Sequence, residues 1–173
     1  RLVGSEMCIR DRLNREEMMD RFLDQLARLM GEADVGEAER VNCHHNYTEK
    51  VQVDGRDVWL TRKGAIDATD GKMGLIPGSM GDRSYVVRGL GNPQALWSAP
   101  HGAGRVMSRT QAKKAYTAED LDKRMTGIVY RPGRQWVDEI PDAYKPIDQV
   151  MTDAESLVEV QHTLRQVMNL KGT

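Results

Sequence analysis

The stretch VQVDGRDVWL, residues 51–60, predicts a β-hairpin from local rules alone. Apolar and polar residues alternate on both sides of the dipeptide Asp54-Gly55, as they do in strands with one buried face. Aspartate followed by glycine favours the tight two-residue turn whose twist matches that of antiparallel strands. The sequence therefore predicts two antiparallel strands within a β-rich region.

Further short strands and helices follow the hairpin. Residues 64–76 and 84–87 continue as short strands interrupted by Gly and Pro, and apolar residues alternate with polar ones again from Val158. Ser108 and Thr117 each precede a helical pattern, and their hydroxyls can accept hydrogen bonds from the first turn. The sequence therefore predicts an α+β fold of mixed sheets with flanking helices.

A helix is expected before the hairpin. Asn14, with Glu17 three residues later, forms a capping-box pattern that predicts a helix start, and Gly31 suits the helix end. The apolar residues between them recur at helical spacing, which favours burial in the core over any chemical role. These residues are Met18, Met19, Phe22, Leu23, Leu26, Leu29 and Met30.

Residues 1–12 stand apart from this pattern. The stretch SEMCIRDR within them has no periodicity of its own and resembles translated adapter sequence. We interpret residues 1–12 as a non-native tail and residues 13–173 as part of one domain. On this interpretation the N-terminal half of the domain is absent and the sheets are incomplete.

Composition is typical of an ordinary soluble protein. With 173 residues and 39% hydrophobic content, the chain is long enough for one domain with a core. No apolar run could span a bilayer and the first residues show no secretory pattern, so no membrane role is expected. Two cysteines and ten methionines favour the reducing cytoplasm. The formal net charge of -1 excludes nucleic-acid binding through net charge alone and leaves room for a local basic face.

Paired histidines occur just before the hairpin, in NCHHNY at residues 42–47. Imidazole is a common metal ligand, but neighbouring side chains on an extended backbone point to opposite faces. We therefore expect at most one of His44 and His45 to bind an ion, while the other packs. Two buried, hydrogen-bonded histidines without a metal remain the alternative.

A glycine-bounded loop, PGSMG at residues 77–81, is followed by Ser84. Glycine lets the backbone turn sharply and present unobstructed N–H groups, and the hydroxyls add donors and acceptors. A loop that holds a nucleotide needs these features. A plain turn between strands needs much the same residues.

The run HGAGR at residues 101–105 leads to Ser108-Arg109. A histidine beside residues without bulky side chains could meet a large ligand, and its nitrogen can attack phosphorus to give a phosphoramidate. Arg105 and Arg109 offer forked donors suited to phosphate oxygens. A histidine next to a glycine turn, without chemistry, is the alternative.

Taken in order, these motifs resemble the RtcB family of RNA ligases. The stretches that carry the resemblance, from about Leu13 to the last residue, are VNCHHNYTEK, WLTRKGAI, IPGSMGDRSYVVRGLGN, HGAGRVMSR, DEIPDAYKPIDQVM and LVEVQHTLRQVMNLKG. The resemblance implies an RtcB-like fold of which this chain is the C-terminal part. It also implies a GTP- and manganese-dependent ligase that joins RNA 3′-phosphate or 2′,3′-cyclic phosphate ends to 5′-hydroxyl ends, in tRNA splicing and RNA repair.

The resemblance assigns roles residue by residue. It implies that His101 attacks the α-phosphorus of GTP and becomes guanylylated, and that His45 binds Mn2+. Tyr144 would stack on guanine and Lys171 would read its edge, with Asn46 beside the nucleotide. The guanosine loop would comprise Pro77, Gly78, Ser79, Met80 and Ser84, and the phosphate and ribose contacts would come from Gly102, Ala103 and Gly104.

The remaining manganese ligands of the family have no match in this chain, and Cys43, His44 and His162 are interpreted as structural. The chain by itself is therefore expected to hold manganese poorly and to ligate little. An archease-type activator is a further partner consistent with the resemblance. The alternatives are a nucleotide-binding phosphohydrolase that does not ligate, and an RNA-binding module without a nucleophile.

Overall fold

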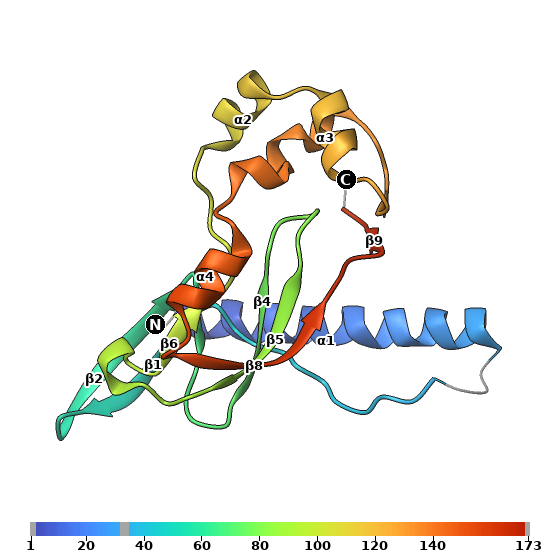
Figure 1. Cartoon of the computed structure of the whole chain (residues 1–173). Coiled ribbons are helices and arrows are strands. Elements are labelled where there is room, and N and C mark those ends of the chain that lie inside the picture. The colour runs from blue at the N-terminus through green and yellow to red at the C-terminus, as the bar shows by residue number, and fades with distance from the viewer. Residues whose placement is uncertain (1–2, 32–34, 172–173) are drawn as a thin grey trace. The chain divides into compact units, whose positions relative to one another are not determined.

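The computed structural model describes residues 3–31 and 35–171, with side chains described from residue 9 onward. It divides into two compact units, Arg1–Asp67 and Ala68–Thr173. Figure 1 shows helices and several short sheets, so the α+β class predicted from the sequence is confirmed. Of the helices in the described part of the chain, none combines the length and the apolar character that crossing a bilayer requires.

The first unit begins with α1, Val3–Met30. The expected helix start at Asn14 is wrong, because that residue lies in the middle of α1 and its side chain donates to Sδ of Met18 (3.7 Å). Residues 3–13 contain no proline, so the helix runs through them and its earlier carbonyls accept the amide hydrogens that Asn14 would otherwise cap. The predicted end is confirmed, since Gly31 follows the helix with a φ of 77°.

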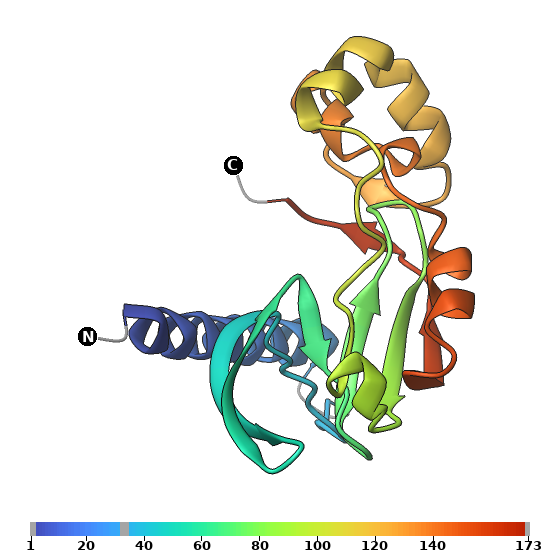
Figure 2. The ribbon, with the colours of Figure 1, turned by 90° about the vertical axis from the view of Figure 1, so that its left-hand side faces the viewer.

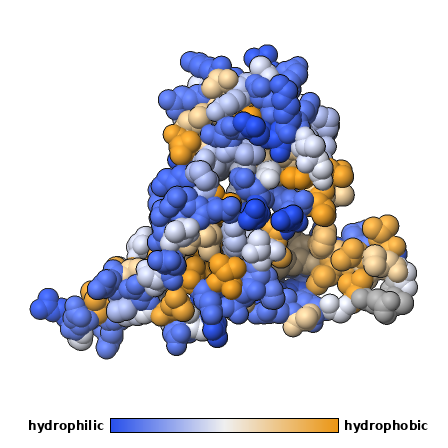
Figure 3. Space-filling model, in the orientation of Figure 1, coloured by the Kyte–Doolittle hydropathy of each residue, from blue (hydrophilic) through white to orange (hydrophobic). Residues whose placement is uncertain are grey.

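None of the apolar residues expected to form a core along α1 is buried, so that expectation is wrong for the described part of this chain. Phe22 keeps 64% of its surface exposed and Leu29 keeps 83%. The helix and residues 37–41 border an open, mainly apolar groove of about 470 Å³. Figure 3 shows apolar side chains gathered toward the C-terminal end of α1. Within the described part of this unit α1 contacts β1, and that contact covers only part of the helix.

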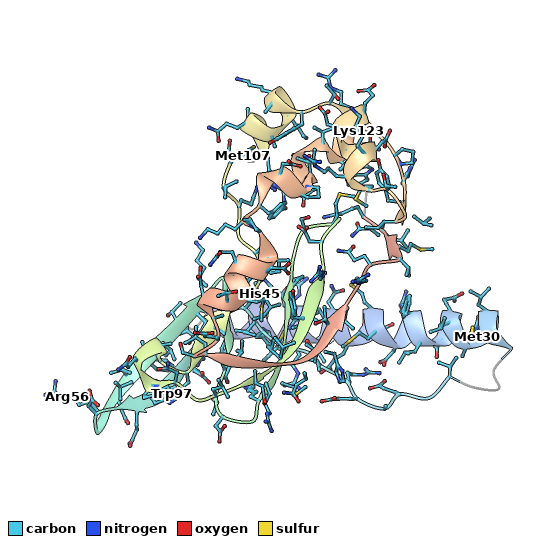
Figure 4. The ribbon with its side chains drawn as sticks, viewed as in Figure 1. Met30, His45, Arg56, Trp97, Met107 and Lys123 are labelled. Atoms are coloured by element: carbon cyan, nitrogen blue, oxygen red, sulfur yellow. The ribbon has the colours of Figure 1, made fainter. Side chains whose placement is uncertain are left out.

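The predicted hairpin is confirmed. β1, Asn46–Val53, pairs with β2, Arg56–Lys63, in antiparallel register. Asp54 and Gly55 both have positive φ, as the two-residue turn requires. Figure 4 places Arg56 at the end of the hairpin. A short strand, β3 at Ala65–Asp67, completes the first unit.

The second unit is built on a three-stranded antiparallel sheet with the order β4-β5-β8. β4 is Met73–Pro77, β5 is Ser84–Gly89 and β8 is Val158–Leu164, which confirms the strands predicted in these regions. Buried and less buried residues alternate along β4 and β5, and Ile76 and Val87 are almost completely buried. The sheet therefore presents one face to the core and fixes the loop between β4 and β5.

Short helices gather at the end of the sheet where the β4–β5 loop lies (Figures 1 and 2). α2, Arg109–Ala115, and α3, Ala118–Arg124, follow the predicted caps Ser108 and Thr117, each with a complete capping box. In Figure 4, Met107 lies just before α2 and Lys123 within α3. The remaining elements are β6 (Ser98–Pro100), β7 (Val129–Tyr130), α4 (Ile147–Asp153), β9 (Met168–Asn169) and the 3-10 helices Pro93–Ala95, Arg134–Glu139 and Pro141–Ala143.

The Thr117 cap is expected to contribute measurably to stability. Its hydroxyl accepts from the Asp120 amide (3.2 Å), and Oδ2 of Asp120 accepts from the Thr117 amide (2.9 Å). Thr117→Ala should lower the free energy of unfolding in urea by about 1 kcal/mol. Thr110→Ala, at an exposed position in α2, is the matched control and should change it by less than about 0.5 kcal/mol. Equal effects of the two substitutions would contradict the capping role.

Candidate active site

The loop between β4 and β5 folds tightly on itself. The Gly78 amide donates to the Arg83 carbonyl (2.9 Å), and the Ser79 amide and hydroxyl both donate to Oδ2 of Asp82 (3.2 and 2.5 Å). A Cβ on Gly78 would lie 2.6 Å from the Arg83 carbonyl oxygen, so a side chain there would force the loop open. The sequence PGSMG therefore forms a closed turn rather than an extended segment.

The histidine loop lies directly against this turn. His101 follows β6 and is exposed, whereas Ala103 is buried. The Ala103 amide donates to the Pro77 carbonyl (3.0 Å), and a Cβ on Gly102 would lie 3.1 Å from the same oxygen. Two loops predicted separately from the sequence are thus brought into contact, with the imidazole on the solvent side.

Met80 and Ser84 occupy different environments within the loop region. Met80 is 4% exposed and lies in the hydrophobic core with Leu121 and Ile140. Ser84 opens β5, where it pairs with Pro77 and is half-buried. The side chain of Met80 therefore stabilises the loop by packing in the core, and mainly the backbone of Met80 is available to contact a ligand.

Tyr144 reaches the histidine loop through backbone contacts. The Lys145 amide donates to the Gly104 carbonyl (2.9 Å), and Arg105 and Tyr144 form an isolated antiparallel bridge. The Arg105 guanidinium lies 4.8 Å from the centre of the Tyr144 ring, and its Nη1 donates to the Tyr144 hydroxyl (2.8 Å). The aromatic ring is thus held at both its face and its hydroxyl.

Lys171 reaches the same place from the end of the chain. Its Nζ lies 3.1 Å from Oε2 of Glu139, the atom that also accepts a hydrogen bond from the Tyr144 hydroxyl (2.7 Å). Oε1 of Glu139 lies 3.2 Å from Nη2 of Arg109. The predicted residues Tyr144 and Lys171 are therefore brought together around one carboxylate.

Arg105 and Arg109 both donate to oxygen atoms of Asp138. Arg105 donates to the Asp138 backbone carbonyl (2.5 Å), and Nη1 of Arg109 donates to Oδ2 of Asp138 (3.3 Å). Lys113 lies 3.3 Å from the other oxygen of the same carboxylate. The expectation that both arginines are available as phosphate forks is therefore not met for Arg105, which is half-buried, while Arg109 remains largely exposed.

The acid–base state of this cluster follows from its contacts. Burial would raise the pKa of Glu139, but hydrogen bonds from Tyr144 and Lys171 and the positive charges of Lys171 and Arg109 lower it overall. Burial, the hydrogen bond to Glu139 and its negative charge raise the pKa of Tyr144 to about 12, against the opposing effect of Arg105. At neutral pH the cluster therefore holds a carboxylate and a neutral phenol.

His45 and Asn46 belong to the first unit, at the start of β1. The Gly64 amide donates to the His45 carbonyl (2.8 Å) and to Oδ1 of Asn46 (3.2 Å), which closes the open end of the hairpin. His44 lies edge-on to Tyr47, with ring centres 5.7 Å apart, and burial followed by the charge of Arg15 lowers its pKa. This packing agrees with a structural role for His44.

The described residues contain no group of three or more His, Cys, Asp or Glu side chains that could hold a metal ion. His45 would be one donor, and an octahedral manganese site needs several more. The residues present therefore do not fit a complete manganese site. Cys43 is half-buried, and His162 lies exposed on β8 opposite Val86.

Glu139 is the residue that sequence reasoning missed. Its carboxylate contacts Tyr144, which is 5 residues later in the sequence, and Lys171, which is 32 residues later. No local sequence pattern predicts such a contact. The pair Asp138-Glu139 reads as an ordinary solvated acidic turn in the sequence. The pair is the start of the stretch DEIPDAYK, whose resemblance to the RtcB family was the one signal that pointed to this segment.

Comparison with known proteins shows the family of this chain. The family model described as "tRNA-splicing ligase RtcB" matches residues 10–172. RNA-splicing ligase RtcB of Escherichia coli K12 is 46% identical over 164 residues, which cover 92% of this chain and 40% of that protein. RNA-splicing ligase RtcB2 of E. coli ATCC 25922 is 35% identical over 138 residues (75% and 36%), and tRNA-splicing ligase RtcB of Aeropyrum pernix is 36% identical over 129 residues (63% and 27%).

These relatives all carry the names of ligases that act in RNA or tRNA splicing. The chain belongs to the RtcB family. It spans about two fifths of the length of the E. coli K12 relative. The match begins at residue 10, within the segment interpreted as non-native; that interpretation of residues 1–12 stays a prediction, and residues 1–2 and 172–173 lie outside the described part of the chain.

Tyr144 is expected to ionise late. Because its pKa is raised, the neutral form is favoured by folding, and the resulting stabilisation is present below about pH 10 and lost as pH rises through about 12. Alkaline absorbance titrations of the wild type and Tyr144→Phe should differ by one transition with its midpoint near pH 12. In guanidinium chloride, where the chain is unfolded, the midpoint of the Tyr144 transition should lie near pH 10. A midpoint near 10 in the folded chain would contradict the partly buried, Glu139-bonded environment of Tyr144.

Proposed function

We propose that the protein containing this chain is a GTP- and manganese-dependent RNA ligase. It joins RNA ends that bear a 3′-phosphate or 2′,3′-cyclic phosphate to ends that bear a 5′-hydroxyl, in tRNA splicing and RNA repair. The observation that carries the proposal is the contact between the loop of His101 and the loop of Pro77, 3.0 Å from the Ala103 amide to the Pro77 carbonyl. The ligase names of the family members support it.

In this proposal His101 is the nucleophile. An imidazole nitrogen with a free lone pair attacks the α-phosphorus of GTP, a P–N bond forms, and the P–O bond to pyrophosphate breaks. The exposed position of His101, beside residues with little side chain, leaves room for a nucleotide to approach. The guanylate then passes to the RNA 3′-phosphate, and attack by the 5′-hydroxyl of the second RNA releases GMP.

Residues around His101 would bind the guanosine. Tyr144 would stack on the base and Lys171 would donate to its edge, and the two already lie on one carboxylate. Gly102, Ala103 and Gly104 would contact the phosphate and ribose. The guanosine loop would comprise Pro77, Gly78, Ser79, Met80 and Ser84, and Asn46 would lie beside the nucleotide.

Manganese, when bound, would offset phosphate charge and polarise the phosphorus under attack. Within this chain His45 would be its ligand. The other donors would have to come from outside the described part of this chain, because the described residues provide no cluster of three metal-binding side chains. RNA ends would be recognised mainly through their phosphates, and an archease-type activator is a further candidate partner.

The nucleophile can be tested in a complete enzyme. In a chimera, this chain replaces the 164 matched residues of E. coli RtcB, whose sequence there is 46% identical. With labelled GTP and manganese, the chimera should carry covalent label, and His101→Asn should reduce it at least about a hundredfold. His162→Asn, on exposed β8, is the matched control and should keep the label. Covalent label that persists in His101→Asn would contradict the assignment of His101 as the nucleophile. Release of GMP without labelled protein would favour a phosphohydrolase.

The chain by itself should behave differently. Under the same conditions the isolated 173-residue chain is expected to take up little label and to ligate little RNA, because His45 alone cannot hold manganese. The measurement is the amount of label on the isolated chain relative to the chimera. Strong labelling of the isolated chain would contradict the expectation that metal donors are missing.

A further inference from the structure

We infer that Glu139 is a positioning residue of the nucleotide site, whose carboxylate holds the Tyr144 ring and the Lys171 ammonium where a guanine base would meet them. The inference rests on the proposed function, which assigns the base contacts to Tyr144 and Lys171. Glu139 has no part in that assignment. Its role follows from contacts within the second unit alone.

One oxygen of Glu139 serves both residues. Oε2 accepts from the Tyr144 hydroxyl at 2.7 Å and from Nζ of Lys171 at 3.1 Å. Glu139 has a side chain that is only 13% exposed, so water competes little for these bonds. A charge-assisted hydrogen bond in such a place restricts the long lysine side chain more than a surface ion pair does.

The second oxygen of Glu139 is also occupied. Oε1 lies 3.2 Å from Nη2 of Arg109 and 3.6 Å from Nη1 of Arg105. With both oxygens engaged by cations and a hydroxyl, the carboxylate is poorly placed to act as a general base or to bind a metal. Its effect on a nucleotide must therefore be transmitted through the side chains that it holds.

The carboxylate is fixed to a buried segment. Glu139 ends the 3-10 helix Arg134–Glu139, and its neighbours Asp138 and Ile140 are 4% and 0% exposed. The same segment is tied to α2, because Asp138 pairs with Arg109 and Lys113. Glu139 can thus impose a position on Tyr144 and Lys171, since its own position is set by the core.

Holding Lys171 in place favours guanine over adenine. An ammonium carries three donors, so Lys171 keeps two for a ligand while one is held by Glu139. Guanine presents a carbonyl oxygen at the position where adenine presents an amino group, and only the carbonyl accepts from an ammonium. Ordering this donor before the ligand arrives removes part of the entropy cost of binding the base.

The test is a comparison of GTP and ATP binding by the full 173-residue chain, measured by calorimetry. The wild type should bind GTP more tightly than ATP. Glu139→Gln keeps the shape and removes the charge; it should weaken GTP binding about tenfold and change ATP binding by less than about twofold. The alkaline midpoint of Tyr144 should also fall from about 12 in the same variant, because the charge and the hydrogen bond of Glu139 contribute to raising that pKa.

Asp142→Asn is the matched control. Asp142 is another partly buried carboxylate in a neighbouring 3-10 helix, bound to Arg124 at 2.7 and 2.8 Å. The control should leave both the GTP preference and the Tyr144 midpoint unchanged. A Glu139→Gln variant that keeps the wild-type GTP preference would overturn the inference and leave the proposed function standing.

Two further outcomes are decisive. A wild-type chain that binds GTP no more tightly than ATP would overturn the inference, whereas the proposed function is tested separately by covalent labelling of the chimera. If Glu139→Gln fails to fold, Tyr144→Phe decides, because it keeps the aromatic ring and removes the hydroxyl with its bonds to Glu139 and Arg105. That variant should weaken GTP binding about threefold to tenfold; unchanged binding would overturn the inference.

Discussion

The contact between the Pro77 carbonyl and the backbone of Gly102 and Ala103 is the constraint on which the candidate site depends. Pro77 ends a strand of the central sheet, so its carbonyl is placed by the sheet register and not by the loop itself. The Ala103 amide binds that carbonyl, and the space for a side chain on Gly102 is filled by the same oxygen at 3.1 Å. A larger residue at either loop would separate them. The Gly104 carbonyl in turn accepts a hydrogen bond from the Lys145 amide. Backbone hydrogen bonds therefore link the sheet to the segment that carries Tyr144.

Charge balance is the second organising feature. Cations from α2, from the histidine loop and from the end of the chain meet around Asp138 and Glu139, whose side chains are 6% and 13% exposed. Without these carboxylates the cations would repel one another in a region where burial weakens solvent screening. A site for an anionic ligand needs positive charge, but it also has to be stable before the ligand arrives. The two carboxylates meet both requirements, since they hold the cations in place while Arg109 and Lys113 stay largely open to solvent.

Much of the fold could be predicted because it follows local rules. The Asp54-Gly55 turn and the caps at Ser108 and Thr117 are decided by side chains and backbone within a few residues of each other. The start of α1 could not be predicted in the same way, although Asn14 and Glu17 make a plausible capping box. A capping pattern stabilises a helix end only where the preceding backbone leaves the helix, and nothing in residues 3–13 forces it to leave. The burial of the apolar face of α1 was predicted wrongly for a related reason: helical spacing shows that a face is apolar but not what covers it.

The candidate site likewise combines features that the local sequence predicts with contacts between residues far apart in the sequence. His101 and the Pro77 loop each have a local signature, and their resemblance to the RtcB family predicts that they belong to one site. The position of Lys171 has no such signature, because it depends on Glu139, 32 residues earlier, and on a chain end that passes the β4–β5 loop. Gln166 makes that passage specific: its side-chain amide donates to the carbonyls of Ser79 and Asp82, at 2.7 and 3.0 Å, across more than 80 residues of sequence. Because the Gln166 side chain donates to two carbonyls of the tight loop, it fixes both that loop and the segment between β8 and β9. The loop that would receive the guanosine and the lysine that would read its base are therefore parts of one hydrogen-bonded structure.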